Sequence, residues 1–509
     1  MNRKWAAVVC IVGFGAFLRA SVSLHGYSGA GKPPMYGDFE AQRHWQEITV
    51  NLPVQQWYHN TTDNDLQYWG LDYPPLTAYH SWICGKVAQL VDPDFVQLHT
   101  SRGFSSAAHK LFMRLTVLLA DILIYLPALY WGCSAVWKGP RMEALPASWT
   151  VLHLVLAMCY PGQILIDNGH FQYNNISLGL TIWAVVSLLR NHFFLSSFLF
   201  SLALNYKQMS LYHAFPFFFY LLAKCVPGGK NKLSFIGAFG RLLRIGAVVL
   251  ITFVVLWLPW LTNIDDMTQV VRRVFPIDRG LFEDKVANFW CTFDTVFKFK
   301  DVIPKEKMAV YCLSTTLISV LPSGLHLLFK ASKENFLLSL INISLGFFLF
   351  SFQVHEKSIL LVAIPALLYF PFDPVMCLWL LEITTFSMIP LLQKDGLFTA
   401  FLALQGIFLL SIRLYHLMSS KSSKKNQRSI DFLLLESFGL SKKAEWKETL
   451  TIWAFYLSLL GQAILLIGQE LLKPPENLPY LFPYLISAFS GLHFIAFFFY
   501  FNVKQLFSL

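Results

Sequence analysis

The sequence has little charge. Only 14% of its 509 residues are Asp, Glu, Lys or Arg, whereas 55% are hydrophobic and 16% are aromatic. Soluble domains carry about 25% charged residues, and a single soluble core stops growing at about 250–300 residues. Such a core also does not need uninterrupted apolar runs of about 20 residues. The composition therefore excludes an ordinary soluble domain and predicts an integral membrane protein.

Cysteine is also scarce, and its spacing indicates neither a zinc cluster nor a disulfide framework. Six of the eight cysteines lie in or beside apolar runs, where Cys behaves as a small hydrophobic residue. These are Cys10, Cys133, Cys159, Cys225, Cys312 and Cys377. We expect Cys84 and Cys291 to be exposed, with a disulfide between them as one alternative. A metal could in principle bind to Asp38, Glu40 and Asp72, but these residues form no convincing cluster, so we predict no metal. We also predict no cofactor and no nucleic-acid partner.

About fourteen apolar runs are candidates for transmembrane helices. They are 5–24, 111–131, 149–166, 171–189, 193–206, 211–223, 242–261, 308–329, 336–353, 358–370, 375–392, 397–417, 450–472 and 481–500. The pair 193–206 and 211–223 is either one broken span or two short ones. The choice would reverse the topology of everything that follows.

The distribution of Lys and Arg orients the chain, because short basic loops stay in the cytoplasm. With the N-terminus inside, the basic loops fall on the cytoplasmic side: "WKGPRME", "LLRNH", "KCVPGGKNKL", "FKASKEN" and "KSSKKNQR". Other polar segments fall on the opposite face: "YGDFEAQRHWQEIT", "IDNGHFQYN", "NYKQMSLYH", "RRVFPIDRGLFEDK" and "FQVHEKS". This pattern predicts two cytoplasmic termini and one site that faces the other compartment.

Two long loops on that face organise the chain. Loop 25–110 contains four tryptophans, which favour the membrane interface, so we expect short interfacial helices there. We divide the chain into a transmembrane module, 1–261, that includes this loop; a second long loop, 262–307; and the remaining transmembrane helices, 308–509. The last part contains a Ser/Lys-rich cytoplasmic connector, 418–449.

The segment that begins at Asp38 is open to two interpretations. Asp38 can be a helix N-cap that accepts a backbone N–H, while Arg43 with Glu47 and Glu40 with His44 form ordinary surface pairs. A carboxylate that the helix dipole keeps ionised can equally accept a proton from a substrate hydroxyl. The two interpretations are compatible.

Other polar groups on this face leave similar alternatives. Asp72 is either a turn residue or a second carboxylate that orients substrate. Two interpretations are open for His355, Glu356 and Lys357: a short loop with its own ion pair, or an anion-binding site. We favour the anion-binding site, because three consecutive ionisable groups at membrane depth are costly. The cations of this face suit phosphate: Lys207, Arg272, Arg273, Arg279 and Lys357. The residues alone therefore indicate lipid-phosphate chemistry or anion transport, and do not choose between them.

Long motifs add a resemblance. The segments "YSGAGKPPMYGDFEAQRHWQEIT", "QYWGLDYPPLTAYHS", "DNGHFQYN", "NYKQM", "FPIDRGLFEDKVANFW" and "FSFQVHEKSIL" closely resemble the endoplasmic-reticulum glucosyltransferases of the asparagine-linked glycosylation pathway. The resemblance covers nearly the whole chain. The segment "WGLDYPPLTAYHS" resembles the sequences of family members that add the first glucose. The shorter motifs "LDYPP" and "VHEKSIL" also occur in the members that add the second glucose.

The resemblance implies an all-α fold of the GT-C type, with about 14 transmembrane helices in the endoplasmic-reticulum membrane and a lumenal site. It implies dolichyl-phosphate glucose as donor and the high-mannose oligosaccharide on dolichyl pyrophosphate as acceptor. Asp38 matches the carboxylate of the "GDFEAQ" motif and is carried over as general base. We predict substrate-binding roles for Glu40, Arg43, His44, Asp72, Tyr73, Asp167, His170 and Gln172. We predict donor-phosphate roles for Lys207, Arg272, Arg273, His355 and Lys357, and a glycan on Asn60.

The bond that is implied fixes the type of mechanism. A β-linked donor that yields an α-1,3-glucoside requires inversion, hence one in-line displacement assisted by one base. Cations can replace a general acid, because a phosphate monoester leaves without being protonated. A transporter or flippase for an anionic lipid or sugar phosphate is the competing class; it would explain the cations but leave Asp38 without a role.

Overall fold

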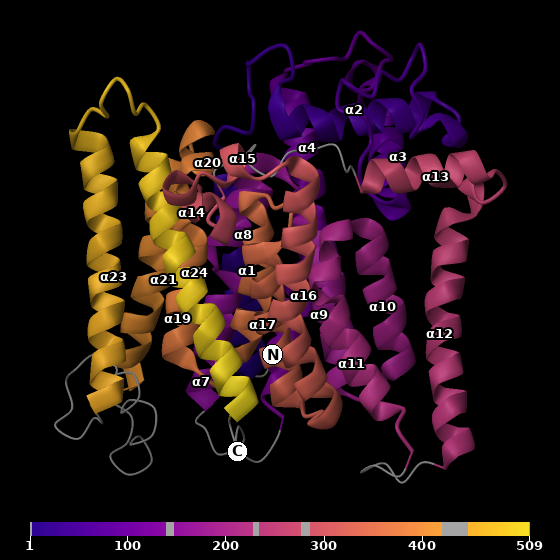
Figure 1. Ribbon diagram of the computed structural model, residues 1–509. Coiled ribbons are helices and arrows are strands. Elements are labelled where there is room, and N and C mark those ends of the chain that lie inside the picture. The colour runs from indigo at the N-terminus through magenta and orange to yellow at the C-terminus, as the bar shows by residue number, and fades with distance from the viewer. Residues whose placement is uncertain (1–2, 139–146, 228–233, 276–285, 420–445, 508–509) are drawn as a thin grey trace.

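The computed structural model is almost entirely helical (Figure 1). It describes residues 3–138, 147–227, 234–275, 286–419 and 446–507. Within these ranges, nine stretches are long and apolar enough to cross a membrane, and three shorter apolar helices accompany them. The predicted all-α architecture of a multi-pass membrane protein is confirmed.

The membrane region consists of helices that cover each of the fourteen predicted apolar runs. They are α1 (Arg3–Val22), α4 (Ala107–Ala120), α5 (Leu126–Val136), α7 (Ala147–Met158), α8 (Pro161–Ile164), α9 (Asn174–Leu189), α10 (Phe193–Tyr206), α11 (Ala214–Lys224), α12 (Phe235–Trp257), α16 (Lys305–Phe329), α17 (Lys333–Phe350), α18 (Leu360–Tyr369), α19 (Pro374–Phe386), α20 (Ile389–Lys394), α21 (Phe398–Ser419), α23 (Trp446–Leu471) and α24 (Leu481–Phe507). The ambiguous pair of runs forms two separate helices, α10 and α11, joined by the 3₁₀ turn η5 (Gln208–His213).

Shorter helices gather at one end of the bundle. They are α2 (Gly37–Asn51), α3 (Pro75–Val91), α13 (Ile264–Val274), α14 (Phe289–Phe297) and α15 (Phe299–Val302), with the 3₁₀ turns η1 (Val54–Gln56), η2 (Pro93–Phe95), η6 (Leu258–Trp260) and η7 (Glu356–Ile359). We call α2, α3 and α13 the cap; they lie across the ends of the membrane helices at the top of Figure 1. The expected helices of the first long loop are thus confirmed.

Aromatic packing holds the cap to the bundle. Trp260, in η6 directly after α12, is fully buried, and its ring centroid lies 5.3 Å from that of Tyr58 and 6.1 Å from that of Trp57. Val270 of α13 and Trp45 of α2 belong to the same cluster. Each large buried aromatic ring contributes substantial apolar contact, so the cluster fixes the cap relative to the top of α12.

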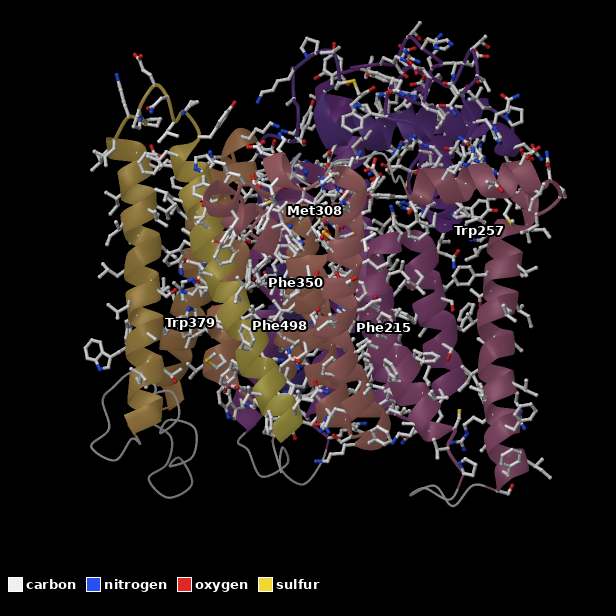
Figure 2. The ribbon with its side chains drawn as sticks, viewed as in Figure 1. Phe215, Trp257, Met308, Phe350, Trp379 and Phe498 are labelled. Atoms are coloured by element: carbon white, nitrogen blue, oxygen red, sulfur yellow. The ribbon has the colours of Figure 1, made fainter. Side chains whose placement is uncertain are left out.

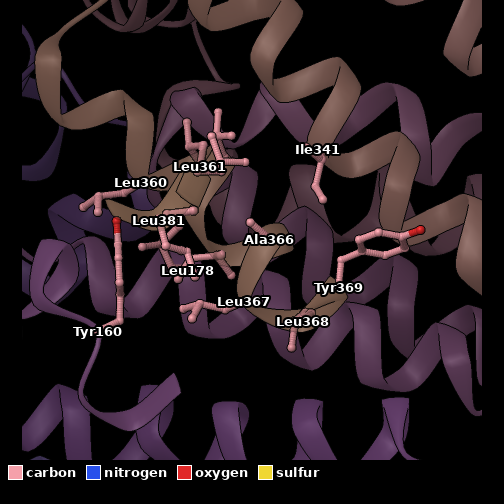
Figure 3. Close-up of a cluster of buried hydrophobic side chains, with 14 of the residues drawn as sticks. Tyr160, Leu178, Ile341, Leu360, Leu361, Ala366, Leu367, Leu368, Tyr369 and Leu381 are labelled. Atoms are coloured by element: carbon pink, nitrogen blue, oxygen red, sulfur yellow. The ribbon is translucent and has the colours of Figure 1, made fainter. Parts of the chain in front are cut away.

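The core of the membrane region lies around α18, whose ten residues are all buried. Figure 3 shows its leucines between side chains from α9, α17 and α19, among them Leu178, Ile341 and Leu381. Lipid tails are as apolar as leucine, so close packing rather than transfer from water stabilises such a core. At Gly132 of α5, an added Cβ would lie 2.9 Å from Leu368, which explains a glycine at this contact.

Two membrane helices contain π-helical turns, η3 (Asp121–Tyr125) and η4 (Leu165–Phe171). Asp121 of η3 forms a fully buried ion pair with Arg19 of α1, whose Nε lies 3.3 Å from Asp121 Oδ1. Arg19 also donates to Gln163 Oε1 at 2.7 Å. π-helical turns are often found at functional sites. Here η4 ends directly beneath the cap, where the candidate site is located.

The described residues place the cap at one end of the membrane helices, and the compartment that this face meets stays a prediction. The C-terminal end of α24 lies on the face opposite the cap (Figure 1), as does the start of α1. The end of α1 leads to the cap side, where Ser28 N donates to His170 O at 3.0 Å. Most of the predicted connector 418–449 lies outside the described residues, and so does Arg279.

The cysteine prediction requires a correction. The described residues form no disulfide. Cys84 is buried in α3 rather than exposed, with Sγ 3.4 Å from His80 Nε2, and burial raises the pKa of its thiol to about 12. Cys291 is half-buried in α14. Helix packing of α3 against the bundle, which the sequence does not reveal, removes Cys84 from the surface.

Candidate active site

Asp38 is the second residue of α2, not its N-cap. The N-cap position belongs to Tyr36, which has a left-handed backbone (φ +55°) and makes no capping bond with its side chain. Gly37 also has a positive φ, which glycine adopts without strain. The N–H of Asp38 donates instead to Ser28 Oγ at 3.3 Å. The N-cap interpretation was therefore wrong, although Asp38 still lies in the first turn, where the helix dipole favours an ionised carboxylate.

Three donors converge on one oxygen of this carboxylate. Asp38 Oδ2 is 3.0 Å from His170 Nε2 and 2.5 Å from Gln172 Nε2, and it pairs with Lys357 Nζ. The other oxygen, Oδ1, accepts no hydrogen bond from the described part of the chain. The Asp38 side chain remains 22% exposed. The site thus presents an ionised carboxylate with one oxygen fixed and the other open.

These surroundings set the protonation state of Asp38. Burial raises the pKa of Asp38, but the charge of Lys357 and the hydrogen bond from His170 outweigh it and hold the pKa well below its usual range. An ion pair of this kind favours the charged form. Asp38 is therefore ionised at neutral pH, and a proton binds to it only weakly as long as Lys357 remains in contact.

The π-helical turn η4 positions His170. Phe171, the last residue of η4, directly follows His170 and is fully buried. Its φ of +88° is a strained conformation that costs about 1–3 kcal/mol in a non-glycine residue. Arg114 supports the turn by donating to the carbonyls of Gly169 and Gly26, each at 2.8 Å. Such strain is characteristic of functional sites, and here it directs both His170 and Gln172 towards the start of α2.

Lys207 lies behind Gln172, directly after α10. Its Nζ donates to Asn174 Oδ1 at 2.5 Å and to Gln172 Oε1 at 3.3 Å, and it lies 4.8 Å from the centre of the Tyr73 ring. Burial and the neighbouring charge of Lys357 lower the pKa of Lys207 to about 7. The predicted residues Tyr73, Gln172, Lys207 and Lys357 are thus brought together around Asp38.

Asp167 lies behind the group of residues around Asp38. It is fully buried in η4, and its two oxygens accept from the backbone N–H groups of Asn174 (3.2 Å) and Asn175 (2.7 Å). It thereby caps the N-terminus of α9. Asn174 in turn receives the hydrogen bond from Lys207. Asp167 therefore supports the site from behind, and a direct contact with substrate stays a prediction.

The other polar residues of α2 form an enclosed ion-pair cluster. Arg43 Nη2 lies 2.6 Å from Glu40 Oε1 and 2.7 Å from Glu47 Oε2, while His44 Nδ1 lies 3.2 Å from Glu47 Oε2. Each of these four side chains is at most 2% exposed. The expected Arg43–Glu47 pair is confirmed, but it is buried rather than at the surface. The expected Glu40–His44 pair was wrong, because His44 pairs with Glu47. Direct substrate contacts for Glu40, Arg43 and His44 remain untested predictions.

The loop before α3 is tied to α13. Arg273 donates to the carbonyls of Gly70 (2.7 Å) and Leu71 (3.2 Å), and Gln208 Nε2 donates to the carbonyl of Asp72 at 3.1 Å. Arg273 therefore anchors the turn that carries Asp72 and Tyr73. Arg272, its neighbour on α13, is exposed. Phosphate contacts for either arginine stay predictions.

Two further predicted residues lie on exposed parts of the cap face. His355 is exposed immediately before η7, two residues from Lys357. Asn60 is exposed in the loop between α2 and α3, and its Oδ1 accepts from the N–H of Leu66 at 3.2 Å. This exposure is compatible with an attached glycan, which stays a prediction.

Sequence analysis did not predict one residue that contacts His170. Asp395, in the turn between α20 and α21, lies with Oδ2 2.5 Å from His170 Nδ1. Its signal is weak: an Asp-Gly turn pair between two apolar runs, at a position that the alternation of spans assigns to the same face as Asp38. About 225 residues separate Asp395 from His170 in the chain, so only the fold reveals the contact.

The arrangement can accept a proton and neutralise an anion in the same place. Asp38 supplies an open carboxylate oxygen, and Lys357, with Lys207 behind it, supplies positive charge. No group of three or more His, Cys, Asp or Glu side chains with a metal-binding arrangement occurs in the described ranges. The geometry fits general-base chemistry on a substrate with an anionic leaving group.

Comparison with known proteins identifies the family. The model of the ALG6, ALG8 glycosyltransferase family matches residues 10–501. The chain is 44% identical over 506 residues to a dolichyl pyrophosphate Man9GlcNAc2 alpha-1,3-glucosyltransferase of Pongo abelii, covering 98% of this chain and 96% of the relative. Proteins of the same name match from Gallus gallus, at 45% over 505 residues, and Rattus norvegicus, at 46% over 507 residues; each match covers 98% of this chain and 96% of the relative. The chain therefore belongs to the ALG6, ALG8 glycosyltransferase family, and its all-helical membrane architecture is of the GT-C type.

Proposed function

We propose that the protein is an inverting α-1,3-glucosyltransferase that acts on Man9GlcNAc2 linked to dolichyl pyrophosphate. The acceptor is the one in the names of relatives that match along nearly their whole length. The donor is dolichyl-phosphate glucose, and the product carries the first glucose on the terminal mannose. The reaction takes place on the cap face, which we assign to the lumen of the endoplasmic reticulum.

The open oxygen of Asp38 is the observation that carries this proposal. Three donors hold Oδ2, so the lone pairs of Oδ1 remain available to an acceptor hydroxyl. A general base must lie within hydrogen-bond reach of the proton that it removes, and a partly exposed carboxylate in a fixed orientation meets this requirement. Family membership supplies the class of reaction, and the site supplies a residue able to perform it.

The chemical step requires one base and a stabilised leaving group. Asp38 Oδ1 takes the proton as the mannose 3-oxygen attacks the anomeric carbon of glucose from the face opposite the phosphate. The bond between that carbon and the phosphate oxygen breaks, and dolichyl phosphate leaves with the electron pair. Cations stabilise this charge without donating a proton, and Lys357, at the edge of the site, is the nearest candidate.

Lys357 also links donor binding to the strength of the base. In the absence of donor it pairs with Asp38 and lowers the pKa of that carboxyl, which weakens Asp38 as a base. The negative charge of a bound donor phosphate competes for the same ammonium group. As Lys357 turns towards the phosphate, Asp38 regains basicity. The base is then strongest when a donor is present.

An apolar groove in the membrane region suits the lipid tail of the donor. It lies between α10 and α12, has a volume of about 650 Å³, and includes Leu202 and Val255 in its walls. Near its cap end, Trp257 of α12 donates to Asn205 Oδ1 at 2.7 Å, and Figure 2 shows Trp257 at this level. Lys207 follows two residues later in the chain. We propose that the isoprenoid chain lies along this groove, with its phosphate near Lys207.

The experiment that tests the proposal uses purified protein in detergent or proteoliposomes. It receives dolichyl-phosphate glucose and either the acceptor that ends in mannose or the same acceptor already carrying one glucose. Glucose transfer to the first acceptor supports the proposal, whereas transfer only to the second assigns the later step. Movement of the donor across the bilayer without any glucosylated product would assign a flippase.

A further inference from the structure

A buried carboxylate faces the back of His170. Asp395 Oδ2 lies 2.5 Å from His170 Nδ1, while His170 Nε2 lies 3.0 Å from Asp38 Oδ2. The side chains of His170 and Asp395 are 3% and 2% exposed. The imidazole is thus held between two carboxylates, of which one opens to the site and the other is enclosed by the protein.

This geometry fixes the role that His170 can take. An ionised carboxylate only accepts hydrogen bonds, so an imidazole that faces one at each nitrogen donates from both and is a cation. His170 therefore has no free position for the proton that Asp38 removes from the acceptor. Its contribution is charge and orientation: the N–H at Nε2 holds Asp38 Oδ2 and leaves Oδ1 open.

The turn that carries Asp395 is firmly placed. Gly396 adopts φ +72°, and Lys32 Nζ donates to the carbonyl of Lys394 at 3.2 Å. A Cβ added to Gly26 would lie 2.9 Å from the carbonyl oxygen of Asp395, so the first loop and this turn are in close contact. A residue of the C-terminal half of the chain is thereby fixed against the catalytic segment of the N-terminal half.

Charged side chains lie on both sides of the His170 imidazole. On the site side, Asp38 and Lys357 face it, with Lys357 Nζ 3.4 Å from His170 Nε2. On the enclosed side lie Asp395 and the guanidinium of Arg114, which donates to the carbonyl of Gly169 next to His170. Asp395 is the carboxylate that offsets the like charges of His170 and Lys357. Without it, two cations would lie in contact with a single carboxylate.

We infer that Asp395 is a positioning residue for glucosyl transfer, acting on Asp38 through His170. The inference rests on the proposed role of Asp38 as base. In Asp395→Asn, the amide no longer requires a donor at Nδ1, so the imidazole can become neutral and the charged hydrogen bond to Asp38 Oδ2 is lost. We expect kcat to fall by about 10–100-fold, by analogy with the loss found when the hydrogen-bond partner of a metal-binding histidine is removed. The KM values for donor and acceptor should change by less than about threefold, because neither substrate contacts Asp395.

The test is a double-mutant cycle on glucose transfer with Asp395→Asn, His170→Gln and the double variant. If Asp395 acts through His170, the double variant has the kcat of His170→Gln within about twofold. Asp395→Glu, which keeps the carboxylate, should recover part of the loss. Asp373→Asn is the matched control: Asp373 also pairs with a lysine, Lys504, but on the face opposite the cap, so kcat per folded molecule should not change.

Each contrary result has a distinct meaning. If the wild-type protein transfers no glucose, the proposed function fails and the inference fails with it. If the wild type is active and Asp395→Asn matches it, only the inference is overturned. The inference is also overturned if the losses of the two single variants add in full, or if Asp395→Glu is no better than Asp395→Asn. A loss in Asp395→Asn confined to a lower melting temperature and fewer folded molecules assigns Asp395 a purely structural role.

Discussion

Two ionic clusters on α2 differ in whether their carboxylate oxygens are enclosed by the protein or open to a ligand. The cluster around Arg43 and the cluster around Asp38 both start from carboxylates in the first turns of α2. In the first, Glu40 and Glu47 are enclosed and satisfied by Arg43, His44 and further donors. In the second, one carboxylate oxygen is held and the other is open. A closed cluster stabilises a fold, whereas an open one can take part in a reaction.

The difference in electrostatics follows from the difference in access. Burial raises the pKa of Glu47, but the hydrogen bond from His44 and the charge of Arg43 lower it to about 2. Asp38 also has a lowered pKa, through Lys357 and His170. Lys357, however, is 17% exposed and is our proposed contact for the donor phosphate, whereas Arg43 is fully buried. Only the ion pair of Asp38 can be released by a ligand.

The largest expected effect comes from breaking the closed cluster. Arg43→Met leaves the carboxylates of Glu40 and Glu47 buried without their cation, so the free energy of unfolding should fall by about 3–5 kcal/mol. The exposed Lys86→Gln on α3 is the control and should stay within about 0.5 kcal/mol. Thermal unfolding of both variants in detergent measures this. An Arg43→Met protein that melts like the wild type would show that the cluster does not stabilise the cap.

Removing the cation of the open cluster should impair the use of donor rather than stability. Lys357→Gln should raise the KM for dolichyl-phosphate glucose by about 10–150-fold, equivalent to the 1.5–3 kcal/mol of a lost charged hydrogen bond. The exposed Lys86→Gln is the matched control, because Lys86 is a lysine without a predicted role in the site, and it should leave the donor KM nearly unchanged. If neutral replacements of Lys207, Arg272, Arg273, His355 and Lys357 all leave donor kinetics unchanged, the phosphate binds elsewhere.

The behaviour of Lys207 with pH sharpens the same comparison. Burial and Lys357 lower the pKa of Lys207 to about 7, so the side chain is charged below this pH and neutral above it. Its attraction for the donor phosphate is therefore lost as pH rises, and the donor KM should increase about tenfold between pH 6 and pH 8. In Lys207→Gln the KM should be high and independent of pH. A wild-type KM that is flat over this range would exclude Lys207 as a phosphate ligand.

The smallest effect concerns the orientation of the cap. If the cap face is lumenal, Asn60 in "NTT" is available for glycosylation, and Asn60→Gln should remove a glycosidase-sensitive shift in gel mobility without altering turnover. Tags at both termini should remain accessible to protease in sealed microsomes. Protection of either tag would contradict the topology.

The sequence predicts more of the fold than of the site. Apolar runs locate the membrane helices because a span needs about 20 apolar residues, whatever its neighbours are. The break between α10 and α11 was open, since two short runs give no signal for the 3₁₀ turn between them. The burial of Cys84 was missed for a similar reason: it depends on how α3 packs against the bundle, which the local sequence does not encode.

Within the candidate site, the motifs indicated segments that the structure brings together, but not which of their polar residues are enclosed. Asp38, His170 and Lys357 come together as their location on one face predicts. Spacing could not show that Arg43 is enclosed, because the closing contacts come from residues such as Ser101, 58 positions away. Nor could it find Asp395, which has no motif of its own. Contacts between distant parts of the chain decide which polar residue is open.

The most direct test of the account is the rate of glucose transfer by Asp38→Asn with both substrates saturating. Asparagine keeps the shape of the side chain but removes its basicity, so turnover should fall by about 10²–10⁴-fold, as for loss of a general base, with the melting temperature and donor affinity near those of the wild type. Asp38→Glu should also be poor, because a shift of about 1 Å can cost about 10²-fold. Near-normal turnover of Asp38→Asn would contradict the account and reduce Asp38 to a structural residue, leaving Glu40 or Asp72 to be examined as the base.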